Sequence, residues 1–222
     1  MTNGLKVKKR NGRGTEPLDL EKIHTMVEEA CKDVTGVSAS QVEIQSGIQF
    51  YDGISTAEIQ DILIKSASDL ITLDNPNYQF VAARLLLFAT RKSLYGRSRD
   101  LPPLEDHIMN CTNIDVYDKE IFGKYSKEEI QKADSFIDHE RDFLFTYAGL
   151  RQVVDKYLVQ DRSTGKVYET PQFMYMMIAL TIFSNYPKET RLDYVQRYYN
   201  AISRHKLNIP TPIMAGVRTP IR

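Results

Sequence analysis

The sequence lacks tryptophan, has only two cysteines among 222 residues, and carries no net charge, with 29 basic and 29 acidic side chains. Cys31 and Cys111 lie far apart and in no metal-ligand spacing, so they form no disulfide framework and suit a reducing compartment. No stretch approaches the roughly 20 apolar residues of a membrane span, and no apolar signal core opens the chain. We therefore expect a cytoplasmic protein without membrane partners.

Zero net charge also excludes a global basic field, so we expect no nucleic-acid partner. Neither common phosphate-binding loop occurs: there is no Gly-x-x-x-x-Gly-Lys-Ser/Thr and no Gly-x-Gly-x-x-Gly after a strand. Paired Cys/His metal spacings are missing, so no metal site is predicted. The four histidines are scattered, and no nucleophile, base and orienting group can be assembled from local spacing. We therefore assign no catalytic residue.

What is present is a mainly helical pattern. Residues 6–18 predict a short β-hairpin, with turn chemistry at 11–14. Four helices follow, opening at Asp19, at Ser38 and Ser55 (each the start of a capping-box pattern) and at Pro76. Residues 1–96 are thus expected to form a small sheet or hairpin with a four-helix bundle.

The polar segment 97–103 ends in a proline pair and is the predicted linker. Residues 104–222 form a second helical region with its own β-hairpin. Its expected elements are a helix capped at Ser126, a longer helical segment over 134–147, a hairpin over 156–169, an all-round apolar helix from Pro171, a helix over 189–205, and an extended strand and turn over 207–216. The charged run 138–142 is interpreted as a solvated or ion-paired helix face.

The most informative stretch is the basic opening. Lys9, Arg10 and Lys22 are expected near one helix start, with the carboxylate of Glu16 between them. Cations at a helix N-terminus suit a polyphosphate, and a carboxylate can accept a hydrogen bond from an amino group such as one on a base. The plain alternative is a solvated hairpin edge, where lysine prevents edge pairing.

Motifs along the whole chain resemble those of a known family. The order Lys9-Arg10-Asn11-Gly12, Glu16 and 18–23 (LDLEKI), followed by four helices, is similar to the ATP-cone module. The rest resembles the large (alpha) subunit of class Ia ribonucleotide reductase. The further matching stretches are 49–54, 61–67, 78–84, 91–92 with 95–96, 136–142, 156–159, 164–169, 183–187 and 209–220.

The resemblance implies an allosteric site for ATP as activator or dATP as inhibitor, with Mg²⁺. Lys9, Arg10 and Lys92 would face the triphosphate, while Glu16 and Asp19 would contact the adenine edge. A carboxylate there accepts from the adenine amino group and disfavours a guanine oxygen. The expected effector-binding residues are Val7, Lys9, Arg10, Glu16, Asp19, Lys22, Ile23, Thr56, Ile59, Gln60 and Lys92.

Within that set, Val7, Ile23 and Ile59 would line the base pocket, and they are equally expected as core. Two departures from the family pattern bear on affinity. Gln60 stands where bacterial members often carry histidine, and the hairpin is one residue longer than usual. Asp19 replaces a commoner asparagine, which adds charge near the base.

The resemblance also places the redox cysteines, the radical cysteine and the active-site Asn and Glu in a barrel beyond Arg222. This chain alone is therefore expected to be inactive and to bind no catalytic cofactor. Of the substrate site only Thr211 has a match, where it would contact the substrate diphosphate. The expected partners are the C-terminal remainder of the large subunit and the radical-generating small (beta) subunit.

Two alternatives remain open on the sequence. The chain could be a stand-alone nucleotide sensor or transcriptional regulator that uses the cone, or its cone could be degenerate and purely structural. The sequence also leaves open whether these 222 residues are an engineered fragment or a separately encoded N-terminal part of a split subunit.

Overall fold

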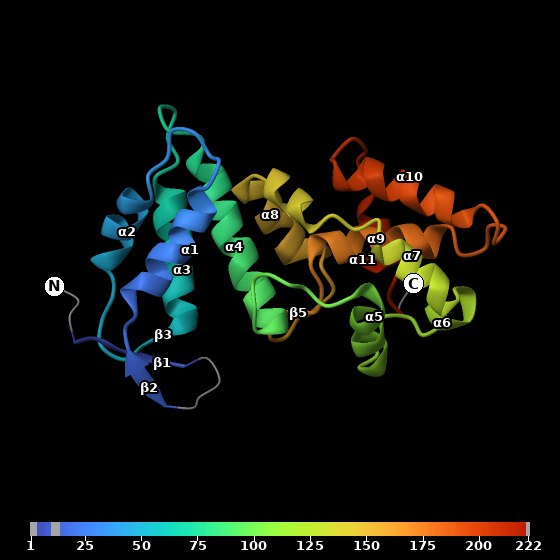
Figure 1. Ribbon diagram of the computed structural model, residues 1–222, viewed down its shortest axis with the longest axis horizontal. Coiled ribbons are helices and arrows are strands. Elements are labelled where there is room, and N and C mark those ends of the chain that lie inside the picture. The colour runs from blue at the N-terminus through green and yellow to red at the C-terminus, as the bar shows by residue number, and fades with distance from the viewer. Residues whose placement is uncertain (1–3, 10–13, 221–222) are drawn as a thin grey trace. The chain divides into compact units, whose positions relative to one another are not determined.

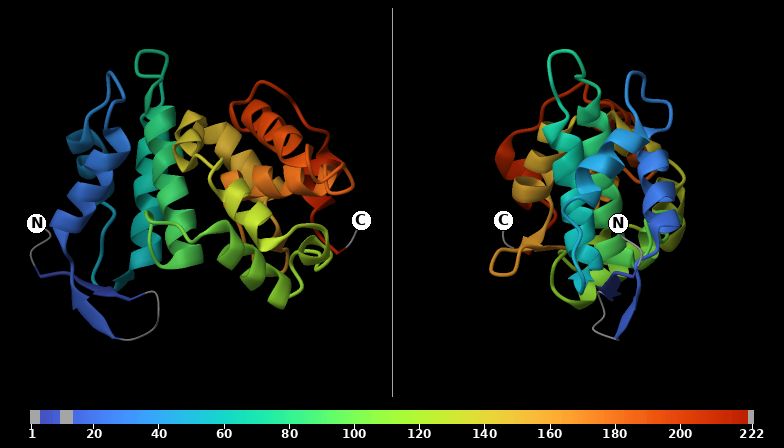
Figure 2. Two further views of the ribbon diagram at one scale, coloured as in Figure 1. Left: turned by 45° about the vertical axis from the view of Figure 1, so that its right-hand side comes forward. Right: turned by 90° about the vertical axis from the view of Figure 1, so that its left-hand side faces the viewer.

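The computed structural model describes residues 4–9 and 14–220. The chain divides into two compact units, Met1–Ala89 with Phe145–Arg151, and Thr90–Leu144 with Gln152–Arg222 (Figures 1 and 2). Each unit is mainly helical with one small sheet, which confirms the predicted fold class. The predicted linker 97–103 lies within the second unit, and the domain boundaries stay a prediction.

The sheet of the first unit has the strand order β2-β1-β3. Strand β1 (Lys6–Lys8) pairs antiparallel with β2 (Thr15–Pro17), as the hairpin pattern predicts, and parallel with β3 (Ile54–Ser55). The third strand escapes prediction because two residues are too few to show alternation. Its pairing places β1 beside the start of the helix that follows β3 at Thr56, and the three strands lie at one end of the helices (Figure 1).

The helices of this unit are α1 (Leu20–Cys31), α2 (Ala39–Gly47), α3 (Thr56–Asp69) and α4 (Tyr78–Tyr95), the last of which runs into the second unit. Asp19 caps α1 by accepting a hydrogen bond from the backbone N–H of Lys22. Ser55 and Glu58 form the predicted capping box of α3, each satisfying the other's backbone N–H. Burial raises the pKa of the half-buried Cys31 thiol to about 11, which keeps it protonated.

The predicted capping box at Ser38 and Gln41 is wrong, because neither side chain caps α2. Both residues instead contact Tyr78, a fully buried side chain at the start of α4. The Tyr78 hydroxyl accepts from the Ser38 backbone N–H at 3.0 Å and donates to Gln41. A long-range tyrosine thus replaces the local cap, which no sequence spacing could indicate.

The second unit surrounds one apolar helix, α9 (Pro171–Ile182). Every residue from Pro171 to Leu180 is buried, as its all-round apolar pattern predicts. Helix α10 (Arg191–Ser203) packs along α9. The 3₁₀ helix η1 (His139–Leu144) and α11 (Thr211–Gly216) also contact α9. The remaining elements are α5 (Leu104–Asn113), α6 (Ile121–Lys124), α7 (Lys127–Asp134), α8 (Tyr147–Gln152), the π-helical η2 (Val153–Tyr157), β4 (Gln160–Asp161) and β5 (Lys166–Val167).

Two predicted elements of this region are wrong. The expected helical segment over 134–147 is broken: α7 ends at Asp134 and a 3₁₀ helix follows, from which Asp142 enters the core to pair with Arg91 at 2.9 Å. The strand expected over 207–216 is instead α11. Pro212 stands in its first turn, where a fixed φ and a missing N–H suit a helix. The hairpin expected over 156–169 is confirmed only in its inner part: its strands are two residues each, and Lys156 and Tyr157 belong to the π-helical η2 instead.

No helix in the described part of the chain is long and apolar enough to cross a membrane.

Candidate functional site

The first candidate site begins where the hairpin closes. Lys9 donates its backbone N–H to the carbonyl of Gly14 at 3.2 Å, and its ammonium lies 2.8 Å from Glu16 Oε2. Both side chains are about two-fifths exposed, at 43% and 39%. The hydrogen bond from Lys9 lowers the pKa of Glu16, so the carboxylate is charged at neutral pH. A cation and an anion are therefore presented together to solvent.

A second ion pair lies at the start of α1. The Lys22 ammonium is 3.1 Å from Asp19 Oδ2, while Asp19 also caps the helix. The hydrogen bond from Lys22 lowers the pKa of Asp19. The positive charge of Lys22 also helps to lower the pKa of Glu16. The four side chains thus form one exposed cluster of two cations and two carboxylates, in the place where the sequence predicts them to meet.

The sheet brings a second helix start to this strand. Lys8 is in parallel register with Ser55, the N-cap of α3, and Thr56 is the first residue of that 14-residue helix. The N-terminus of a helix carries a partial positive charge and free N–H groups, which favour an anion. Thr56 therefore lies beside the strand that leads into Lys9.

The apolar and amide members of the predicted set are buried. Val7, Ile23 and Ile59 are 4%, 7% and 6% exposed, and Gln60 is 5% exposed. They come from β1, α1 and α3 and belong to the core of the first unit, as expected for the three apolar residues but not for Gln60. The base pocket of Val7, Ile23 and Ile59 and the effector contact of Gln60 stay predictions.

The two remaining predicted phosphate contacts are Arg10 and Lys92. Arg10 lies outside the described residues. Lys92 lies in the last turn of α4, in the segment that belongs to the second unit. Their roles stay predictions.

Sequence reasoning missed a neighbouring polar group on the same unit. A half-open cavity of about 290 Å³ lies between α1 and α2 and is lined by Ile23, His24 and Glu43 among others. His24 Nδ1 is 2.7 Å from Glu43 Oε1, and this hydrogen bond raises the pKa of the imidazole. The two residues are on different helices, so no local spacing links them.

Thr211, the predicted substrate contact, is the exposed first residue of α11. Its hydroxyl oxygen lies 3.5 Å from the hydroxyl oxygen of Tyr157, at the end of η2. In the sequence, Tyr157 stands out only as part of the stretch 156–159 that resembles the family. In the structure, its hydroxyl is a polar neighbour of the Thr211 hydroxyl.

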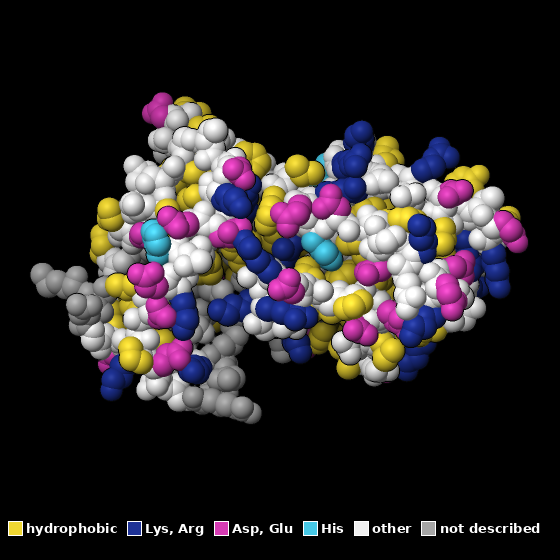
Figure 3. All heavy atoms as spheres, in the orientation of Figure 1, with side chains coloured by type: hydrophobic (Ala, Val, Ile, Leu, Met, Phe, Trp, Pro, Cys, Tyr) yellow, Lys and Arg dark blue, Asp and Glu magenta, His cyan; other side chains and the backbone are white. Residues whose placement is uncertain are grey.

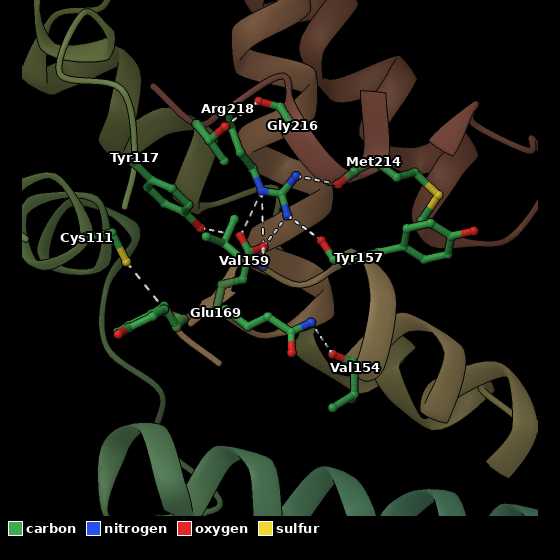
Figure 4. A network of polar contacts seen from close by, with 12 residues as sticks. Cys111, Tyr117, Val154, Tyr157, Val159, Glu169, Met214, Gly216 and Arg218 are labelled. Carbon is green, nitrogen blue, oxygen red and sulfur yellow. Dashed lines mark hydrogen bonds and ion pairs between the residues drawn. The ribbon is translucent and has the colours of Figure 1, made fainter. Parts of the chain in front are cut away.

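A buried polar network of the second unit contacts the backbone of Tyr157 (Figure 4). Arg218 and Glu169 are both fully buried and form a two-pronged ion pair. The Tyr117 hydroxyl donates to Glu169, and the Val159 backbone N–H donates to it at 2.7 Å. Arg218 donates two further N–H groups to backbone carbonyls, so the charges of the pair are compensated by each other and by hydrogen bonds.

Lysine and arginine side chains lie among aspartates and glutamates over the face shown in Figure 3, in keeping with the zero net charge. Within residues 4–9 and 14–220, no three His, Cys, Asp or Glu side chains are arranged to hold a metal ion.

Comparison with known families defines the class of protein. Residues 5–93 match the ATP cone domain, and residues 143–222 match the ribonucleotide reductase all-alpha domain. The chain therefore belongs to the class Ia ribonucleotide reductase large-subunit family and corresponds to the N-terminal region of those chains.

Individual relatives match all or most of the sequence. The chain is 49% identical over 222 residues to ribonucleoside-diphosphate reductase 1 subunit alpha of Escherichia coli (strain K12), and equally to the subunit alpha of Haemophilus influenzae. It is 47% identical over 189 residues, 84% of its length, to the subunit alpha of Enterobacteria phage T4. It spans 29%, 29% and 25% of those three proteins.

Proposed function

We propose that the first unit binds ATP or dATP as the effector that sets the overall activity of a ribonucleoside-diphosphate reductase. The observation that supports this most is the exposed cluster of Lys9, Glu16, Asp19 and Lys22 on an ATP cone domain. The ammonium groups and the start of α3 offer positive charge to a triphosphate, together with Arg10 and Lys92. Mg²⁺ would be held largely by the phosphates and water, as is usual for this ion.

The carboxylates give the site its choice of base. Glu16 and Asp19 can accept a hydrogen bond from the adenine amino group, whereas the corresponding guanine oxygen would meet a like charge. Thr56 and Gln60 complete the polar side of the site, and Val7, Ile23 and Ile59 its apolar side. The choice between ATP and dATP depends on one hydroxyl, whose hydrogen bond contributes only about 0.5–1.5 kcal/mol.

Calorimetric titration of the chain tests the effector site. ATP and dATP are expected to bind, and Lys9→Ala is expected to weaken ATP binding by about 10–100-fold, because a charge-assisted hydrogen bond contributes about 1.5–3 kcal/mol. Glu16→Ala should reduce the preference for ATP over GTP. Lys65→Ala is the matched control, since Lys65 is an exposed lysine of the same unit that pairs with Asp69 on its own helix. Absence of heat with both adenine nucleotides would instead indicate a degenerate, structural cone.

We further propose that the chain completes a catalytic large subunit, with Thr211 contacting the substrate diphosphate. The reductive chemistry then belongs to the C-terminal remainder, and the radical to the small subunit. Co-expression of the chain with that remainder, assayed with the small subunit, is expected to restore reduction of ribonucleoside diphosphates. No restoration with any effector would refute this part of the proposal and favour a stand-alone nucleotide sensor.

A further inference from the structure

We infer that Tyr157 is a second diphosphate-binding residue beside Thr211, and that Arg218 positions both. This inference rests on the proposed role of Thr211 and deepens it. The two hydroxyl oxygens are 3.5 Å apart. A hydroxyl donor reaches an acceptor oxygen at about 2.7 Å, so both hydroxyls can donate to one phosphoryl oxygen placed between them. Donation to a charged oxygen is stronger than donation between neutral groups.

The two hydroxyls are accessible and directed by separate elements. Thr211 is exposed at the start of α11, and Tyr157 is half-buried at the end of η2. Gln152 Nε2 lies 3.5 Å from the Tyr157 hydroxyl oxygen, close enough to help orient it. Because the residues are on different elements, the distance between their hydroxyls depends on the contacts that hold α11 against η2.

One guanidinium joins them. Arg218 Nη1 donates to the carbonyl of Met214 in α11 at 2.6 Å, and Nη2 donates to the carbonyl of Tyr157 itself at 2.9 Å (Figure 4). The rigid planar fork of arginine fixes the angle between these two bonds. The side chain of Arg218 therefore ties the helix that carries Thr211 to the turn that carries Tyr157.

Arg218 cannot bind the phosphate itself. It is about 1% exposed, and Glu169, equally buried, neutralises its charge through two hydrogen-bonded contacts. Glu169 is held in turn by Tyr117 and by the Val159 backbone N–H. Arg218 is thus a positioning residue, and the positive charge for the diphosphate must come from elsewhere in the assembled enzyme.

The test uses the complex of this chain with the remainder of the large subunit and the small subunit, with CDP as substrate. Tyr157→Phe removes only the hydroxyl and is expected to raise KM about tenfold while kcat changes less than about twofold, as for loss of uniform binding. Tyr186→Phe, a half-exposed tyrosine packed on Phe183, is the control and should leave KM unchanged.

Outcomes separate this inference from the proposed function. No turnover by the unchanged complex refutes the substrate role of Thr211, and the inference with it. Turnover with an unchanged KM in Tyr157→Phe refutes only the role of Tyr157.

The positioning role of Arg218 needs a variant that still folds. The double variant Glu169→Gln with Arg218→Met removes both buried charges and keeps an acceptor for the Val159 N–H. It is expected to fold, yet to raise KM at least as much as Tyr157→Phe, because the bonds to Met214 and Tyr157 are lost. Arg218→Lys with Glu169 intact keeps a cation at this position, so it should raise KM less than the double variant does. A folded double variant with an unchanged KM would show that Arg218 is only structural.

Discussion

Replacing Arg218 with methionine is expected to lower the free energy of unfolding of the second unit by about 3–5 kcal/mol, the usual cost of leaving a buried charge without its partner. Glu169 would remain fully buried, with only the Tyr117 hydroxyl and the Val159 N–H as donors. The carbonyls of Met214 and Tyr157 would also lose their donor. Urea unfolding, followed by hydrogen exchange in the second unit, measures the loss.

The controls follow from the same pair. Adding Glu169→Gln to Arg218→Met is expected to recover much of the stability, because replacing a whole buried ion pair is often neutral. The exposed pair of Lys119 with Asp115, 2.7 Å apart, gives the matched surface comparison. Lys119→Met should change stability by less than about 1 kcal/mol. A similarly small loss in Arg218→Met would contradict the view that this ion pair anchors α11.

The features that the sequence predicts well are local ones. The capping box of Ser55 with Glu58 spans four consecutive residues, and β1 pairs with β2, the next strand along the chain. Such patterns are satisfied by neighbours along the chain, so their physics is complete within a short window. The same holds for the predicted cap of α1, where Asp19 accepts a hydrogen bond from the backbone N–H of Lys22, three residues further on.

The features that it misses depend on partners far along the chain. Arg218 and Glu169 are 49 residues apart, and Arg91 and Asp142 are 51 apart. The charged run 138–142 shows the limit well: it was expected to be solvated or ion-paired, and Asp142 is ion-paired but fully buried. Asp142 is the carboxylate of this run that enters the core, because Arg91 lies there to pair with it.

The candidate sites divide in the same way. Lys9, Glu16, Asp19 and Lys22 meet because the hairpin leads directly into α1. Tyr157 could not be assigned from sequence, because its link to Thr211 passes through the folded packing of η2 against α11. Resemblance to a family supplied the proposed role of Thr211, whereas its neighbour Tyr157 comes from the structure.

The second large effect concerns acid pH and centres on His107, a buried residue of α5. Its ring stacks on Phe173 with centroids 4.1 Å apart. Its nitrogens lie 3.0 Å from the Tyr117 hydroxyl oxygen and 3.3 Å from that of Tyr95. Burial lowers the pKa of His107 to about 4, since the charged imidazolium would lose its hydration; nearby Glu169 opposes this shift only in part.

Stability of the second unit is therefore expected to fall as the pH falls from about 6.5 to 4. In this range the unfolded chain binds a proton at His107, with an ordinary pKa of about 6.5, and the folded chain does not. The loss attributable to His107 is about 1.4 kcal/mol per pH unit, or about 3 kcal/mol over the range. Half-buried His139, whose pKa burial also lowers to about 4, acts in the same direction. Carboxylates with lowered pKa values lose their contribution only below about 4.3, so they do not cause this slope.

Urea unfolding at a series of pH values, with the His107 ring followed by NMR, measures the effect. His107→Gln keeps a polar partner for Tyr117 and should remove the contribution of this residue, so that the slope between pH 6.5 and 4 becomes shallower. His24→Gln is the matched control, because Glu43 raises the pKa of His24 and its contribution has the opposite sign. It should leave the acid loss of the second unit in place. If the His107 ring instead titrates near pH 6.5 in the folded chain, the imidazolium is tolerated in this core and the slope must arise from other groups.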